Sequence, residues 1–213
     1  MPLTPHLISK WKAFFAFLDT DKDGTITFND FDILARNFTQ SSVALPENNA
    51  MRLHNLWLQW WWLMEKCLGE NSLEITDSMY MSCMRLLQEG KYPALRAEFE
   101  GLWEAMFHII DDDRDGNLTE LELAVFYRWH GLDSEGFAHR VFVHLDLDTN
   151  GFISEEEFMD AMKEFWFGDD PNNDYSFMFS TTATPPPRRR KLRKSASTVP
   201  VEQIETWWCC VVL

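Results

Sequence analysis

Acidic side chains recur at alternating positions in three short segments of this 213-residue chain. Each segment has an oxygen-bearing side chain at positions one, three and five, a glycine at position six and a carboxylate at position twelve. Calcium is a hard cation that takes roughly six to eight oxygen ligands, and a twelve-residue loop with this spacing supplies them. The glycine permits the sharp turn that brings those ligands together. The three segments are therefore predicted to bind calcium.

The predicted ligands follow from their loop positions, with side chains at positions one, three, five and twelve and a backbone carbonyl at position seven. In the first loop they are Asp19, Asp21, Asp23, Thr25 and Asp30. In the second matching loop they are Asp111, Asp113, Asp115, Asn117 and Glu122. In the last loop they are Asp146, Asp148, Asn150, Phe152 and Glu157. Position nine, which often binds through water, is occupied by Thr27, Thr119 or Ser154.

The first loop differs from the other two at position twelve, where Asp30 replaces glutamate. Aspartate is one methylene shorter, so contact through both carboxylate oxygens is harder to reach. Magnesium accepts fewer protein ligands and competes better at such a site. The first loop is therefore predicted to be the least calcium-selective of the three.

Apolar residues at helical spacing flank each loop, which predicts a helix on both sides. Those before the three loops include Trp11, Phe14, Phe15, Leu18, Phe99, Leu102, Trp103, Met106, Phe107, Ile110, Phe137, Val141 and Phe142. Those after them include Phe28, Phe31, Leu34, Leu121, Val125, Phe126, Trp129, Phe158, Met162, Phe165 and Trp166. Helix, loop and helix with these ligands form the EF-hand motif.

An odd number of such hands is unexpected, because the short strand inside each loop needs a partner for its backbone groups. A fourth hand is predicted at Leu68 to Met79, with Glu74, Ile75 and Thr76 pairing with Thr25, Ile26 and Thr27. This loop has leucine at position one, leucine at the glycine position and methionine at position twelve. It should keep the fold without binding calcium.

The segment entering this silent hand, roughly residues 49–67, contains four tryptophans among other apolar residues. A helix that is apolar on nearly every side is buried or lies between layers. Ordinary core packing is one interpretation, and one wall of an internal ligand cavity is another.

Composition excludes several other classes of protein. The formal net charge of −15 would repel nucleic acid phosphates, so no nucleic-acid partner is expected. The chain has no P-loop, no H-E-x-x-H and no nucleophile motif, and its six histidines lack metal-site spacing, so no enzymatic activity is predicted.

The apolar stretch 13–18 is too brief for a secretory signal. Four cysteines without a framework pattern fit a reducing compartment, and Cys67 and Cys83 are expected to be buried apolar residues.

Four features of the sequence resemble one family. They are the unequal separation of the four loops, the silent second hand, the ending E-F-W-F-G-D-D-P at 164–171 and the later Phe177-Met178-Phe179. The chain is similar to the sarcoplasmic calcium-binding proteins and their relatives, the calexcitins and the coelenterazine-utilising photoproteins and coelenterazine-binding proteins. The likeness covers about residues 5–180. It implies a four-hand globule that acts as a cytosolic calcium buffer or sensor. It also leaves open a calcium-triggered carrier of a hydrophobic small molecule.

Two positions depart from the photoproteins within this resemblance. Those proteins have a histidine four residues before the tryptophan of the final helix, whereas this chain has Met162 before Trp166. They also have a histidine eight residues before the first calcium ligand, where this chain has Trp11. The resemblance therefore does not extend to luminescence.

The carboxyl end has a different composition. Residues 185–213 carry six basic groups and two acidic ones, a net +4, which leaves −19 on the rest of the chain. Cys210-Val211-Val212-Leu213 fits the C-a-a-X pattern, and a final leucine favours geranylgeranylation of Cys210. A single lipid anchors weakly, but Cys209 could be palmitoylated and the run RRRKLRK could bind anionic lipid.

Two questions about this end stay open at the level of sequence. Phosphate on Ser195, Ser197 or Thr198 would cancel basic charge and loosen a membrane contact. The basic run could also be a nuclear localisation signal, or it could bind the acidic body of the same chain. Beside a prenylation signal, the attachment to an anionic membrane surface is the favoured interpretation.

Together these patterns predict an all-α fold of four EF-hands in two pairs, forming a compact globule with a disordered tail. The predicted parts are residues 1–92 for the first pair, 93–179 for the second and 180–213 for the basic tail. The predicted function is calcium buffering or sensing at the cytoplasmic face of a membrane, with calcium at three sites and a target protein as a possible partner.

Overall fold

The fold consists of helices joined by acidic loops, seen in a computed structural model that describes residues 3–40, 47–69, 72–132, 136–172 and 175–180. The predicted lipidation, phosphorylation and basic-run residues of the tail all lie outside these described residues. The described helices are α1 (Pro5–Leu18), α2 (Phe28–Gln40), α3 (Glu47–Leu68), α4 (Asp77–Gln88), α5 (Pro93–Ile110), α6 (Glu120–Trp129), α7 (Phe137–Leu145), α8 (Glu155–Phe167) and the 3₁₀ turn η1 (Ser176–Met178). None of them is long and apolar enough to cross a membrane.

Two short antiparallel sheets join the loops in pairs. The strand β1 (Thr25–Thr27) pairs with β2 (Glu74–Thr76), and β3 (Asn117–Leu118) pairs with β4 (Ile153–Ser154). The register sets Ile26 opposite Ile75, which confirms both the hidden second hand and its predicted alignment. The all-α prediction of four hands in two pairs is confirmed as well.

Local sequence accounts for where the helices begin. Thr4 caps α1 by accepting a hydrogen bond from the backbone N–H of Leu7 at 3.3 Å, and Pro5 occupies the first turn, where its missing N–H costs nothing. At the start of α6 and α8 the cap is reciprocal, because the glutamate three residues later bonds back to the capping residue. The silent hand keeps only one of these two hydrogen bonds. The Thr76 side chain caps α4, but Met79 has no carboxylate to accept a hydrogen bond from the backbone of Thr76.

One aromatic core joins the two pairs of hands. Phe14 of α1 is fully buried, and rings from three other helices and from Phe179 surround it. Its ring centroid lies 4.7 Å from that of Trp166 on α8, 5.5 Å from Trp103 on α5 and 6.3 Å from Trp60 on α3. It also lies 4.9 Å from Phe179, so the Phe177-Met178-Phe179 segment packs against α1.

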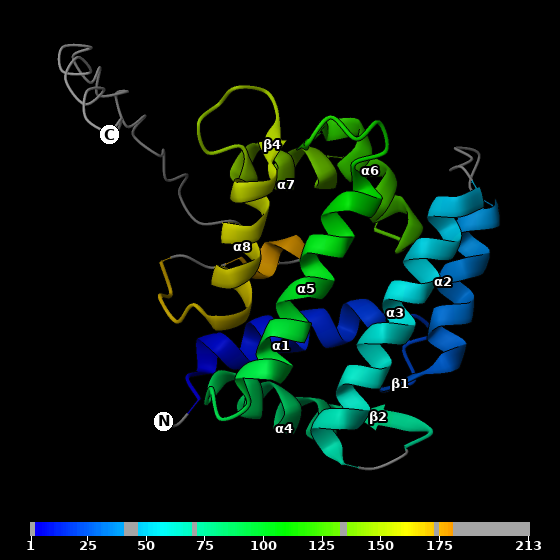
Figure 1. The fold of residues 1–213 in the computed structure, drawn as a ribbon, viewed down its shortest axis with the longest axis vertical. Helices are drawn as coiled ribbons and strands as arrows, with labels where there is room; N and C mark the ends of the chain where they lie inside the picture. Colours follow the sequence, from blue (N-terminus) through cyan, green and yellow to red (C-terminus); the bar gives the residue numbers. More distant parts are fainter. Residues whose placement is uncertain (1–2, 41–46, 70–71, 133–135, 173–174, 181–213) are drawn as a thin grey trace, which may run out of the picture.

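The first and last helices are also joined by polar contacts. The Lys10 side chain is completely buried, and its Nζ donates to the carbonyl oxygens of Glu164, at 2.6 Å, and Gly168. These carbonyls lie at the C-terminal end of α8, where a cation is favourable. Trp11 Nε1 donates to the Trp166 carbonyl at 3.0 Å. In Figure 1, α1 accordingly crosses the middle of the molecule, with α8 above it and α4 below it, and it contacts both helices.

Two predictions about buried faces were partly wrong. The helix α3 is not buried on every side, because Trp57, Trp60 and Trp61 lie in the core while Trp62 is 57% exposed. Trp60, Trp61 and Trp62 are consecutive, and each helical position is turned by about 100° from the one before, so the three side chains cannot all face the same core. Leu121 is 72% exposed although it matched the helical spacing, since Glu122 beside it takes the position that faces the loop.

The two cysteines of the body are free thiols. Cys83 is buried as predicted, whereas Cys67 is only half-buried. A hydrogen bond with Cys67 and burial both raise the pKa of the Cys83 thiol far above its ordinary value, so that thiol stays protonated.

Candidate calcium sites

The residue at position one organises each of the three acidic loops. Asp19 accepts hydrogen bonds from the backbone N–H groups of Asp23, at 3.1 Å, and Gly24, at 3.1 Å. Asp111 and Asp146 repeat the pattern with their own loop residues at 3.1–3.2 Å. Each aspartate is nearly buried at the end of its entering helix, so the loop backbone curls around one carboxylate.

The loop backbone turns through the left-handed region at two positions. Position four has a φ of 61° at Lys22, 61° at Arg114 and 62° at Thr149, where non-glycine residues are uncommon. Position six has a φ of 93° at Gly24, 84° at Gly116 and 90° at Gly151, which a residue without a Cβ adopts freely. The same backbone path therefore recurs three times, as the matching sequences predict.

The carboxylate at position twelve closes each loop by binding both of its ends. In the third hand, one oxygen of Glu122 accepts from the Asp112 N–H at 2.9 Å, and the other accepts from the N–H and hydroxyl of Thr119 at 2.8 and 2.7 Å. Glu157 does the same in the fourth hand, with Leu147 at 2.9 Å and Ser154 at 3.0 and 2.9 Å.

Asp30 makes the same contacts with a shorter side chain. Its Oδ1 accepts from the Thr20 N–H at 2.7 Å, and its Oδ2 accepts from the N–H and hydroxyl of Thr27 at 2.8 and 3.1 Å. Asp30 is completely buried, whereas Glu122 is only half-buried. Asp30 therefore reaches both ends of its loop with a side chain that is one methylene shorter than that of Glu122.

Ligating oxygens converge in all three loops. One carboxylate oxygen from each of positions one, three and twelve lies within 4.8 Å of the others, and the three groups are Asp19 with Asp21 and Asp30, Asp111 with Asp113 and Glu122, and Asp146 with Asp148 and Glu157. Three carboxylates so close together, with the one at position one buried, repel one another unless a cation lies between them. Oxygen-only donor sets of this kind fit a hard cation such as calcium.

The residues predicted at positions five and seven lie on the same loops but outside these three-membered groups. Asp23, Asp115 and Asn150 each accept a hydrogen bond at 2.8 Å from the backbone N–H of the position-seven residue, respectively Thr25, Asn117 and Phe152. This bond fixes the peptide unit that precedes the position-seven residue, and the carbonyl of that residue, in the next peptide unit, is the predicted ligand. Their part in binding metal remains a prediction.

The silent hand has no comparable group in the part of it that the structure describes. Residues 72–79 contribute Glu74 and Asp77 as acids, and neither belongs to a cluster of three potential ligands. Asp77 instead lies 3.7 Å from Lys12 of α1. Its strand still pairs with β1, so the second hand supports the first loop without a ligand set of its own.

Sequence reasoning missed one further cluster, formed by Glu104, His108 and Glu155. Histidine spacing could not reveal it, because it contains a single histidine. The signal that could have indicated half of it is the four-residue separation of Glu104 and His108, which sets two potential ligands on one face of a helix.

Helix, acidic loop and paired strand, repeated in this way, define the EF-hand class, and comparison with known proteins agrees. Residues 99–163 match the family model described as an EF-hand domain pair, and residues 12–34 match the model described as an EF hand. These matches span the first, third and fourth hands. The chain is an EF-hand protein.

Its relatives are sarcoplasmic calcium-binding proteins and photoproteins. It is 27% identical over 128 residues to the sarcoplasmic calcium-binding protein of Perinereis vancaurica tetradentata, covering 60% of this chain and 71% of that protein. It is 26% identical over 176 residues to mitrocomin of Mitrocoma cellularia, covering 78% of this chain and 85% of that protein.

The fold is shared with solved structures of the same group. The calcium-loaded apo form of the coelenterazine-binding protein from Renilla muelleri aligns with a TM-score of 0.63 at 23% identity, covering 82% of this chain and 98% of that one. The sarcoplasmic calcium-binding protein from amphioxus aligns with a TM-score of 0.59 at 16% identity, covering 84% and 99%. The resemblance inferred from sequence is thereby confirmed: the protein is a calcium-binding EF-hand protein related to the sarcoplasmic calcium-binding proteins and the coelenterazine-binding proteins.

Proposed function

We propose that the protein binds calcium at its first, third and fourth loops and serves as a calcium buffer or sensor at the cytoplasmic face of a membrane. The observation that carries the calcium part is the convergence of three carboxylates in each loop to within 4.8 Å. The aspartates at position one are only 4–6% exposed, and burying their negative charge without a cation costs free energy.

Equilibrium dialysis of the full chain against labelled calcium tests the number of sites. We expect three calcium ions per chain at micromolar free calcium, and one fewer when Asp111→Asn or Asp146→Asn removes a position-one carboxylate. Binding of a single ion, or none, would contradict the proposal.

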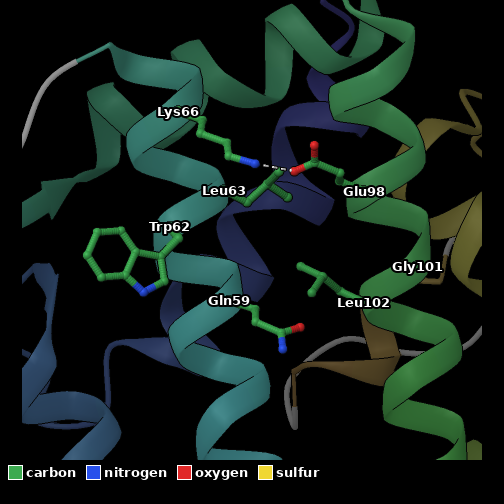
Figure 2. Close-up of a pocket in the computed structure, with 7 residues that line it drawn as sticks. All are labelled: Gln59, Trp62, Leu63, Lys66, Glu98, Gly101 and Leu102. Carbon is green, nitrogen blue, oxygen red and sulfur yellow. Dashed lines mark hydrogen bonds and ion pairs between the residues drawn. The ribbon is translucent and has the colours of Figure 1, made fainter.

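The response of the surface to calcium distinguishes a sensor from a buffer. Exposed large apolar residues lie on several separate segments, and Trp62 lines an open groove between α3 and α5 with Leu63 and Leu102. Figure 2 shows that Lys66 of α3 and Glu98 of α5 meet across this groove, with Nζ and Oε2 2.7 Å apart. A sensor would widen such a groove for a target protein when calcium binds, whereas a buffer would not.

A hydrophobic fluorescent dye measures that difference directly. Calcium-dependent dye binding that falls in a Trp62→Gln variant would favour a sensor that uses this groove. Dye binding that calcium does not change would favour a buffer.

Magnesium competition is proposed at the first loop alone. Asp30 accepts hydrogen bonds from both ends of its loop, as Glu122 and Glu157 do in theirs, but its side chain is one methylene shorter. Calorimetric calcium titrations with and without millimolar magnesium should show weakened calcium binding at one site of three. Equal weakening at all three sites would contradict a special role for Asp30.

Membrane attachment is proposed to come from the tail. The C-a-a-X ending at Cys210, the adjacent Cys209 and the basic run supply a lipid and a charge signal, whereas the rest of the chain carries −19 and would be repelled by anionic lipid. Imaging a Cys210→Ser variant tests this, and a variant that remains at membranes as strongly as the parent protein would refute it. Glutamate at Ser195, Ser197 and Thr198 should weaken attachment if phosphorylation releases the tail.

A calcium-triggered carrier of a hydrophobic small molecule is the second candidate. The observation that favours it is a set of buried polar atoms with no hydrogen-bond partner among the described residues, namely the Nε1 atoms of Trp57, Trp60, Trp61, Trp103 and Trp166 and the hydroxyl of Tyr80. Buried donors normally find partners, and an apolar ligand with acceptor atoms would supply them. A relative of the same fold is named as a coelenterazine-binding protein.

Fluorescence titration tests the carrier. Coelenterazine added to the calcium-free protein should quench tryptophan emission in a saturable way, and calcium should reverse the quenching. Quenching that does not saturate, or that calcium leaves unchanged, would refute this candidate without affecting the calcium sites.

A further inference from the structure

A second kind of metal-ligating cluster lies outside the calcium loops. Glu104, His108 and Glu155 each offer one ligand atom, and these atoms lie within 4.8 Å of one another. The Nε2 atom of His108 is 3.7 Å from Oε1 of Glu155. The group lies at the surface, with His108 and Glu155 about half exposed, so an ion from solution can reach it.

The fold brings these three residues together through two rigid helices. Glu104 and His108 are four residues apart on α5 and therefore neighbours on one helical face. Glu155 is the first residue of α8, which packs against α5. The buried rings of Phe107 on α5 and Phe158 on α8 have centroids 5.5 Å apart, so these two helices pack against each other.

The donor set is different from that of the calcium loops. One imidazole nitrogen with two carboxylates suits a first-row transition ion such as zinc, whereas calcium takes oxygen ligands only. Around a tetrahedral zinc with bonds of about 2.0–2.1 Å, neighbouring ligand atoms lie about 3.4 Å apart. The observed 3.7 Å between His108 and Glu155 is close to that separation, and rotation of the exposed Glu104 side chain can supply the third ligand.

An ordinary ion pair between His108 and Glu155 does not account for Glu104. A single carboxylate satisfies a histidine, and a second one within 4.8 Å repels the first. His139 shows the simpler arrangement, because its Nδ1 meets one carboxylate oxygen of Glu120 at 3.0 Å and belongs to no such cluster among the described residues. The extra carboxylate is what a divalent ion would require.

We propose that Glu104, His108 and Glu155 form a zinc-class transition-metal site, with water completing the coordination. The bound ion would bridge the helix that enters the third hand and the helix that leaves the fourth. The three ligands come together only in the folded chain, so zinc would stabilise the fold of this pair of hands. Glu155 lies two residues before the calcium ligand position Glu157, so the site adjoins the fourth loop without sharing its ligands.

Zinc titration of the calcium-saturated full chain tests the proposal, in a background where the four cysteines are serine so that thiolates do not bind the ion. Saturating calcium keeps zinc out of the acidic loops. We expect one zinc per chain and at least a roughly tenfold loss of zinc affinity in His108→Gln and in Glu104→Gln, since even residues that only orient metal ligands have effects of about 10–100-fold. His139→Gln removes another exposed histidine, one that is paired with a single carboxylate, and should leave zinc affinity unchanged.

Cobalt and thermal unfolding give independent readouts. Cobalt should acquire the visible absorption of a tetrahedral or five-coordinate site in the parent and lose it in His108→Gln. Zinc should raise the unfolding midpoint of the calcium-loaded parent and of His139→Gln, but not of His108→Gln. Zinc binding that is absent, or equal in the parent and His108→Gln, would overturn the proposal while leaving the calcium function intact.

Discussion

The two pairs of hands reach the same architecture with different ligand sets. In the second pair both loops carry a glutamate at position twelve, and each glutamate also completes a reciprocal cap on its helix. In the first pair one loop ends in Asp30 and the other in Met79. Both pairs are nevertheless joined by an antiparallel strand pair with isoleucine or leucine at its buried centre.

The difference separates what pairing needs from what metal binding needs. Pairing depends on backbone hydrogen bonds and on one apolar side chain per strand, such as Ile26 opposite Ile75. A calcium loop of this kind uses a carboxylate at position twelve, and the second hand has Met79 there instead. A hand without ligands can therefore persist as the structural partner of one that keeps them.

The largest expected effect comes from removing a position-twelve carboxylate in the second pair. Glu157→Gln removes a charged ligand and also weakens the tie between the two ends of the fourth loop. We expect the fourth site to lose calcium at micromolar free concentration, which calorimetric stoichiometry will show as one ion fewer. Glu156→Gln removes the same charge from an exposed neighbour outside the ligand set and should keep all sites.

The next effect tests whether the two pairs unfold together. Phe14→Ala empties the centre of the core that α1 shares with α3, α5 and α8, and a buried phenylalanine of this kind costs about 3–5 kcal/mol. Denaturant unfolding in calcium should shift as one transition followed by probes in both pairs. If only the first pair were destabilised, the shared core would not couple them.

A surface substitution between the same pairs provides the control for Phe14. Glu98→Gln breaks the exposed contact with Lys66 across the groove, and such pairs contribute about 0–1 kcal/mol. Its unfolding midpoint should lie close to that of the parent protein.

Acid should loosen the junction between the pairs through His130. His130 follows the last residue of α6, and its ring stacks on Phe17 of α1 with the ring centroids 4.4 Å apart. Burial lowers the pKa of its imidazole from 6.5 to about 4. His130 therefore binds a proton more weakly in the folded chain than in the unfolded chain. Its contribution to the free energy of unfolding is fully present above pH 6.5 and is lost as the pH falls toward 4. The loss amounts to about 3 kcal/mol by proton linkage.

Replacing His130 with phenylalanine isolates this contribution. His130→Phe keeps an aromatic ring beside Phe17 and Phe126 but cannot take up a proton. Between pH 6.5 and 4 its unfolding free energy should fall less steeply than that of the parent, while His139→Gln should follow the parent. Identical slopes for His130→Phe and the parent would show that His130 does not control the junction.

The smallest expected effect on metal binding comes from a substitution that makes the first loop resemble the others. Asp30→Glu restores the longer carboxylate and should increase preference for calcium over magnesium at that site by roughly tenfold, or about 1.4 kcal/mol. Because Asp30 is completely buried, the extra methylene also costs about 1–3 kcal/mol of overpacking in the metal-free protein. Calorimetry with and without magnesium measures the first effect and thermal unfolding the second, and unchanged selectivity would place the difference between the loops elsewhere.

The sequence by itself determined the hands, their pairing and their candidate ligands. Ligand spacing is local, so Asp19, Asp111 and Asp146 could be assigned from a twelve-residue pattern, and the need to pair strand edges placed Ile75 opposite Ile26. Only the tertiary structure decided which face of each helix meets the core: it exposed Trp62 while burying Trp61. It also brought Glu155 to His108 across 47 residues of chain. Such choices depend on how helices pack against each other, and no local pattern encodes the contact between residues that only the complete fold makes neighbours.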